Sequence, residues 1–248
     1  MRSRICTYLS LLSYFILFNS CKRQNMCDCL KSYGDIVSVT NIVPPFTTLD
    51  VFDKIDVYYT QDATVSSYSV KVVTGKHLLS NISTVVTNGV LQIKNNNKCN
   101  FVRGSHNDVT VYVTTPFIGR LIQDGVGTIS ATNMITQDTL SYQINNSGDM
   151  YLNVNVQSIK GSIYGVGDIY LTGTTQNHNV NAAGECFVNA QNLQTSYTFI
   201  VYNSTGQANI NVSGWLDATI SYQGNIYYSG NPATIHKSGI GSGKLIQN

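Results

Sequence analysis

Gly148-Asp-Met-Tyr-Leu152 is followed, nineteen residues later, by Gly167-Asp-Ile-Tyr-Leu171. These are the clearest copies of a pattern in which a glycine precedes a polar residue and then an apolar-x-apolar strand segment. Further copies begin at Gly127, Gly184, Gly206, Gly224 and, more weakly, Gly243. The intervals between successive glycines are 21, 19, 17, 22, 18 and 19 residues. A near-constant period of this size is typical of a solenoid rather than a sandwich.

A second alternating strand lies between the glycines, as in Thr139–Ile144 and Ala218–Tyr222. One repeat cannot bury its own apolar face, so successive repeats must stack into a continuous core. The sequence therefore predicts an all-β protein with a β-helix (β-solenoid) over residues 121–248. Residues 34–120 are strand-like but lack the repeat, and we expect them to start the stack and cap its open end.

The composition agrees with this fold class. The chain has 248 residues, of which 42% are apolar and 11% charged, so it can bury a core and is not a charge-rich disordered chain. Glu185 is its one glutamate, while Val, Ile, Thr, Tyr, Asn and Gly abound, which favours strands and turns over helices.

Residues 1–20 have the features of an export signal. Arg2 and Arg4 precede the apolar run Leu9–Phe18, which is too short to span a bilayer comfortably. Cys21 follows Ser20 as the lipidated cysteine does in a bacterial lipobox, whereas ordinary cleavage and a retained anchor are the alternatives. We expect a tether over residues 21–33 and an outer-membrane lipoprotein of the cell envelope, either periplasmic or surface-exposed, that contacts the membrane only through its lipid.

Removal of the signal makes the chain electrically neutral. Of its 15 basic residues two lie in the signal, and the remaining 13 balance 13 acidic residues. Nucleic acid is thereby excluded as a partner, because binding its phosphates needs a dense basic face.

Strand alternation assigns the side chains of each repeat to the core or to the surface. The second and fourth residues after each glycine point inward, and the third points outward. The resulting outward column is Ser130, Tyr151, Tyr170, Phe187, Asn209, Tyr227 and Ile246. Its aromatic members Tyr151, Tyr170, Phe187 and Tyr227 form a candidate binding face for sugar rings or a protein partner. The alternative is a cross-strand aromatic ladder that stabilises the sheet.

Asp149, Asp168 and Glu185 follow three successive repeat glycines. Stacked carboxylates could bind Ca²⁺ or supply an acid/base pair that acts on polysaccharide. The alternative, which we favour, is that each residue caps its turn by a local hydrogen bond. No catalytic residue, metal ligand set or cofactor motif is predicted.

The cysteines provide no zinc-ligand spacing. Export permits a disulfide from Cys99 to Cys27 or Cys29, and the pairing stays open. Cys186 is predicted to be a small buried hydrophobe in an apolar strand.

The chain resembles the putative auto-transporter adhesin head GIN domain family (DUF2807) of Bacteroidota envelope proteins over about residues 40–235. The matching segments are Phe46–Val51, Ile55–Gln61, Leu91–Asn100, Val111–Pro116 and the Gly-x-Gly pairs at 125–127 and 165–167. The resemblance implies a β-solenoid lipoprotein or exported protein of unknown activity, and it carries no functional residues.

We therefore expect an exported, lipid-anchored, non-enzymatic protein that binds a glycan or an envelope or cell-surface protein. A carbohydrate-active β-helix enzyme, either a lyase or a hydrolase, is one alternative. A purely structural envelope protein is the other.

Overall fold

The computed structural model describes residues 32–98 and 108–248. The predicted signal, the lipidation site Cys21, nearly all of the tether, and Cys27, Cys29 and Cys99 lie outside these residues. Apart from the short 3-10 turn η2 (Leu79–Asn81), the regular structure of the described chain consists of strands. No helix within these ranges is long and apolar enough to cross a membrane.

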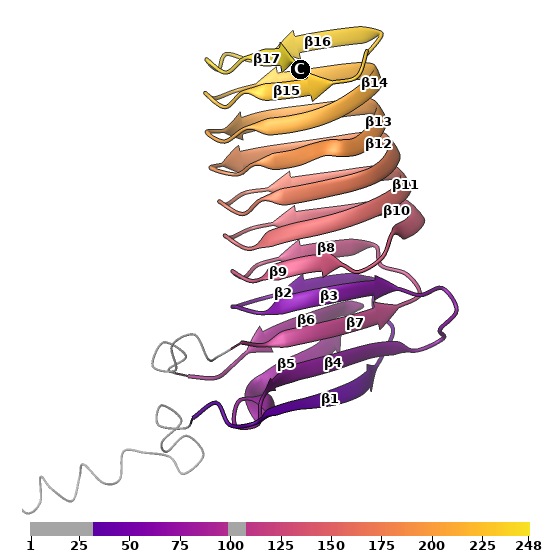
Figure 1. The fold of residues 1–248 in the computed structure, drawn as a ribbon, viewed down its shortest axis with the longest axis vertical. Helices are drawn as coiled ribbons and strands as arrows, with labels where there is room; N and C mark the ends of the chain where they lie inside the picture. Colours follow the sequence, from indigo (N-terminus) through magenta and orange to yellow (C-terminus); the bar gives the residue numbers. More distant parts are fainter. Residues whose placement is uncertain (1–31, 99–107) are drawn as a thin grey trace, which may run out of the picture.

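In chain order the strands are β1 (Ile36–Val43), β2 (Thr48–Val51), β3 (Asp56–Gln61), β4 (Tyr68–Gly75), β5 (Ile82–Thr87), β6 (Val90–Asn95), β7 (Thr110–Thr115), β8 (Arg120–Gln123), β9 (Thr128–Ala131), β10 (Ile135–Ile144), β11 (Asp149–Ile163), β12 (Ile169–Gly184), β13 (Val188–Ser204), β14 (Ala208–Ile220), β15 (Ile226–Ser229), β16 (Thr234–Ser238) and β17 (Leu245–Gln247). They stack as successive rungs of an all-β solenoid (Figure 1), so the predicted fold class is confirmed.

The solenoid has two sheet faces. Strands β11 to β14 each run along the first, bend, and continue along the second: β11, for instance, pairs with β9 through Tyr151 and with β10 from Val154 onward. Face 1 runs in the order β1, β4, β7, β3, β9, the first parts of β11 to β14, β15 and β17. Face 2 runs in the order β5, β6, β2, β8, β10, the second parts of β11 to β14, and β16.

The N-terminal strands enter the stack out of chain order. The rung of β2 and β3 lies between the rung of β6 and β7 and that of β8 and β9, and all of these pairings are parallel. Strands β1, β4 and β5 pair antiparallel at the end of the stack (Figure 1). This non-repetitive end covers rungs whose apolar residues would otherwise face water.

The inward residues form continuous files through the core. Ile129, Met150, Ile169 and Ala208, which are second residues after repeat glycines, are completely buried, as alternation predicts. The large rings of Tyr59, Tyr142 and Tyr202 are buried in the same core. One contiguous apolar cluster extends from Phe46 to Tyr228.

The stacking of the repeat glycines in successive coils shows that the predicted repeat is wrong at one coil. Gly148 lies against the carbonyl oxygen of Gly127, and Gly167 lies against that of Gly148, but Gly184 lies against Gly165. In the coil that follows Gly167, the equivalent position is occupied by Cys186, whose carbonyl oxygen lies against Gly206. The copy predicted at Gly184 is therefore two residues early. Cys186 is buried as predicted, but in the corner between β12 and β13 rather than in a strand.

Candidate binding surfaces

The acidic residues bridge neighbouring coils. Asp149 Oδ1 accepts a hydrogen bond of 2.8 Å from the backbone N–H of Asp168, and Asp168 Oδ1 accepts one of 2.8 Å from that of Phe187. We expected a local hydrogen bond within the same turn, whereas each carboxylate accepts its bond from a backbone donor of the next coil. Asn225 Oδ1 does the same for Lys244 N–H, also at 2.8 Å.

Glu185 does not belong to this file. Because the repeat is displaced at that coil, Phe187 occupies the position of Asp168, and Glu185 lies exposed two residues earlier. Burial and the neighbouring Asp149 carboxylate raise the pKa of Asp168, whereas the hydrogen bond from the Phe187 N–H lowers it. Within the described ranges, no group of three or more acidic, histidine or cysteine side chains is arranged to hold a metal ion.

Replacing the Asp149 carboxylate tests this capping. Asp149→Ala leaves the Asp168 N–H without its acceptor and should lower the free energy of unfolding by about 1 kcal/mol. Asp149→Asn keeps an acceptor oxygen and should cost less. Thermal unfolding with and without millimolar CaCl₂ measures both effects. A Tm of the native chain that rises with Ca²⁺ would contradict capping as the role of this carboxylate.

The predicted aromatic column is divided by the same displacement. Tyr151 and Tyr170 are neighbours on face 1 and stack with ring centroids 4.5 Å apart and planes 6° apart. The next two positions of this column are occupied by Asn189 and Asn209. Phe187 therefore lies outside the column, contrary to the prediction. Tyr227 follows Asn209 as expected. The four predicted aromatic residues therefore do not form one continuous platform.

A larger exposed aromatic group lies on face 2. Tyr197 and Trp215 are register partners on β13 and β14, and Phe199 is two residues from Tyr197 on the same side of the strand. Each of the three is 41% exposed. Asn177, Asn179 and Asn181 on β12 are partners of Tyr197, Phe199 and Val201. We call these seven residues the aromatic–amide surface.

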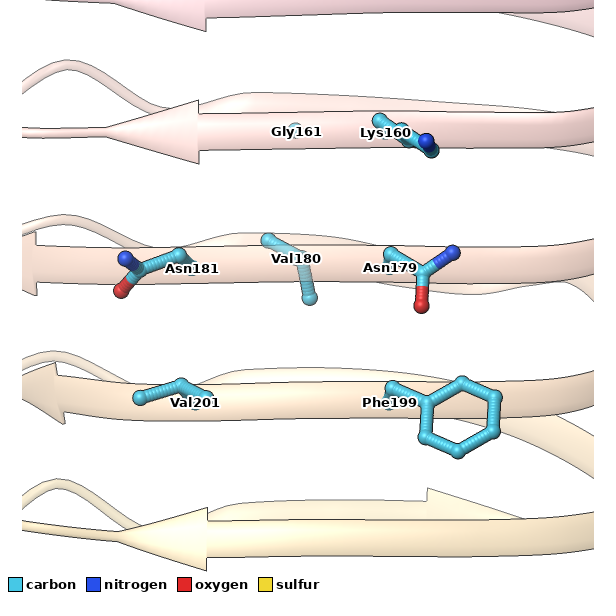
Figure 2. Close-up of a pocket in the computed structure, with 7 residues that line it drawn as sticks. All are labelled: Lys160, Gly161, Asn179, Val180, Asn181, Phe199 and Val201. Carbon is cyan, nitrogen blue, oxygen red and sulfur yellow. The ribbon is translucent and has the colours of Figure 1, made fainter.

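A shallow depression of about 330 Å³ lies on this surface. Figure 2 shows Lys160, Asn179 and Phe199 in one column across three strands, Asn181 and Val201 in a second, and Gly161 and Val180 between them. Gly161 has no side chain, and Val180 is turned into the core. The two columns are therefore walls on either side of a floor that runs along the solenoid axis.

The core beneath the depression is neutral at physiological pH. His178 lies between Asn177 and Asn179 in sequence but points inward, and its Nε2 is 3.5 Å from Tyr142 Oη. Complete burial lowers the pKa of His178 to about 4, so the ring is uncharged at pH 7. The charge that borders the depression comes from Lys160, and neutral amides and apolar groups make up the rest of its lining.

Sequence reasoning did not identify this surface. The sequence carries a signal of it in β13, where Tyr197, Phe199 and Val201 alternate with the buried Thr198 and Ile200. Three exposed apolar residues on one side of a strand indicate either a partner surface or a buried second face.

The described residues thus define a two-faced parallel β-solenoid with an extended aromatic and amide surface. Residues 45–232 match the family described as "Putative auto-transporter adhesin, head GIN domain" (DUF2807), and the chain belongs to this family. Family membership suggests a binding or adhesion role at the cell envelope or surface rather than catalysis.

Solved structures share the fold. A crystal structure described as a putative adhesin from Bacteroides fragilis is 22% identical, with a TM-score of 0.76 over 86% of this chain and 97% of that one. One described as a putative lipid binding protein from Parabacteroides distasonis is 19% identical, with a TM-score of 0.69 over 87% and 97%. At these identities the likeness concerns the fold alone. No curated protein is similar enough to this chain to count as a match.

Proposed function

We propose that this chain is an exported, lipid-tethered envelope protein that binds a glycan chain along the aromatic–amide surface of face 2. The observation that carries the proposal is the juxtaposition of three exposed aromatic rings with a row of three asparagines beside the depression. The family assignment supports a binding role, and residues 1–21 support export and lipidation by their sequence.

The chemistry of this surface fits a glycan. Aromatic rings offer apolar faces to the C–H groups of a sugar, and amide side chains both donate hydrogen bonds to hydroxyls and accept them. The depression follows the solenoid axis across several strands, so an extended chain can contact successive rungs. Because the sheet holds these side chains in fixed register, little conformational freedom is lost when a ligand binds.

A carbohydrate-active enzyme is less well supported. That alternative requires the acidic column to face a groove, but Asp149 begins β11 on face 1, Asp168 directly precedes β12 on the same side, and the depression lies on face 2. Their Oδ1 atoms already accept hydrogen bonds from backbone N–H groups. Neither carboxylate is placed to act on a chain bound along the aromatic–amide surface.

Binding of the full-length chain to an array of bacterial and host glycans tests the proposal. Phe199→Ala and Trp215→Ala should each weaken binding about tenfold or more, equivalent to about 1.4 kcal/mol per tenfold change. Tyr222→Ala is the matched control, because this tyrosine is 49% exposed but lies outside the surface. If both surface variants bind as the native chain does, the aromatic–amide surface is not the binding site.

A further inference from the structure

A run of four tyrosines on face 1 is interrupted by one small residue. The register places Tyr112 beside Tyr58, Tyr58 beside Ser130, and Ser130 beside Tyr151, which is followed by Tyr170. The residues come from β7, β3, β9, β11 and β12, which lie in this order along the stack (Figure 1). The interruption is therefore a single rung with a tyrosine pair on each side.

The geometry of the two pairs leaves a ring face open on each side of Ser130. Tyr58 and Tyr112 stack at 5.3 Å and 20°, and Tyr151 and Tyr170 stack at 4.5 Å and 6°. These centroid distances are close to the strand spacing, so the ring planes lie across the stacking direction. Since Tyr112 and Tyr170 cover the outer sides, the free faces of Tyr58 and Tyr151 look toward the rung of Ser130.

This opening has the width of one missing ring. Two strand spacings separate Tyr58 from Tyr151, about 9.6 Å, so a ring centred above Ser130 would lie about 4.8 Å from each tyrosine. That distance is within the range of stacked ring contacts. Tyr58 is 38% exposed and Tyr151 is 41% exposed, so solvent reaches both rings.

The neighbouring outward residues are polar on both sides of the opening. Asp56 and Asp149 lie two residues before the wall tyrosines, and Thr60 and Asn153 lie two residues after them. A ligand held between the rings therefore meets apolar surfaces on its two faces and hydrogen-bonding groups around its edge. A neutral pyranose with equatorial hydroxyls has this distribution, because its axial C–H groups cover both faces and its hydroxyls radiate from the edge.

We propose that Tyr58 and Tyr151 clamp one neutral, gluco-configured pyranose ring above Ser130. A phenyl side chain would fill the space but could neither donate nor accept a hydrogen bond at the polar edge, where Asp56 Oδ1 and Asp149 Oδ1 already accept bonds from backbone N–H groups. A uronic acid would bring its carboxylate close to Asp56 and Asp149. This tyrosine clamp lies on the face opposite the aromatic–amide surface, so it does not depend on that surface binding a glycan.

Saturation-transfer NMR of the full-length chain with methyl β-D-glucopyranoside tests the clamp. Its axial H1, H3 and H5 lie on one face of the sugar, and H2 and H4 lie on the other. Because both faces contact tyrosine, saturation should reach the two sets to similar extents.

Ser130→Tyr places a side chain in the opening and should reduce the transfer at least fivefold, with an unchanged or raised Tm. Tyr58→Leu removes one wall and should selectively reduce transfer to one set.

Phe199→Ala separates this site from the one on face 2: it removes any transfer that arises at the aromatic–amide surface, and the transfer that it leaves should reach both proton sets equally and be lost when Ser130→Tyr is added. Loss of the signal in Phe199→Ala together with its retention in Ser130→Tyr would overturn the clamp while supporting the aromatic–amide surface. Absence of transfer to the glucoside in the native chain would also overturn it, as would tighter binding of p-cresol than of the glucoside.

Discussion

Gly167→Ala is expected to lower the free energy of unfolding by about 3 kcal/mol. A Cβ at this position would lie 2.1 Å from the carbonyl oxygen of Gly148 in the preceding coil. The obstructing atom is backbone, so no side-chain rotation relieves the clash. The N–H of Gly167 also donates to the carbonyl oxygen of Asn146 at 3.0 Å, which ties the corner in place. The coils must therefore separate or tilt locally, with loss of packing in the adjacent core.

Thermal unfolding should show this cost as a Tm lower by roughly 10 °C. Gly119→Ala is the matched control, because its added Cβ would lie 3.3 Å from the carbonyl oxygen of Thr47, a contact that a shift of a few tenths of an ångström relieves. Its cost should stay below about 1 kcal/mol. Equal Tm values for the two variants would mean that close approach of the coils does not explain the repeat glycines.

The fold could be predicted because each repeat in the sequence corresponds to one coil of the solenoid. Where one coil meets the next at a corner, Gly148 and Gly167 lie against a backbone oxygen, so glycine recurs in the sequence. In the coil after Gly167, the equivalent position is occupied by Cys186. Gly184, which has a φ of 115°, stacks on Gly165 instead. The intervals of 17 and 22 residues were the two outliers of the period. Reading Cys186 as the repeat position makes them 19 and 20.

The order of the N-terminal rungs could not be predicted in the same way. Residues 48–61 lie between strands that follow them in the chain, and a pairing of strands so far apart in the sequence leaves no local motif. The candidate sites depended on register even more strongly. An error of two residues moved Phe187 and Glu185 out of their columns. The aromatic–amide surface needed a comparison across coils that strand alternation alone does not make.

Acidification is expected to destabilise the protein through His178, because this ring is buried as the neutral form. Burial lowers its pKa to about 4, whereas the unfolded chain binds the proton near pH 6.5. Its Nδ1 is a buried atom without a hydrogen-bond partner among the described residues. The contribution of neutral His178 to stability is therefore complete above pH 6.5 and is lost as the pH falls toward 4, a loss of about 3 kcal/mol.

Asp50 has the opposite effect over nearly the same range of pH. Burial, followed by the Asp124 carboxylate, raises the pKa of Asp50 from 3.8 to about 6. A carboxyl group whose pKa is raised on folding stabilises the folded state below the unfolded pKa and loses that contribution as the pH rises through the folded pKa. Between pH 4 and 6 the two groups therefore compensate, and the native chain should show a shallow pH dependence from this pair.

Single variants should separate the two contributions. Asp50→Asn should be about 2 kcal/mol more stable than the native chain at pH 7, and its stability should fall steeply between pH 6.5 and 4. His178→Leu should lose its acid sensitivity, so that its stability relative to the native chain rises as the pH falls. Urea unfolding at half-unit steps of pH measures both slopes.

Since Asp50 lies on face 2 near Gln92 and His178 lies in the core near Tyr142, the double variant should combine the two effects additively. Curves that run parallel to that of the native chain would show that neither group changes its protonation on unfolding.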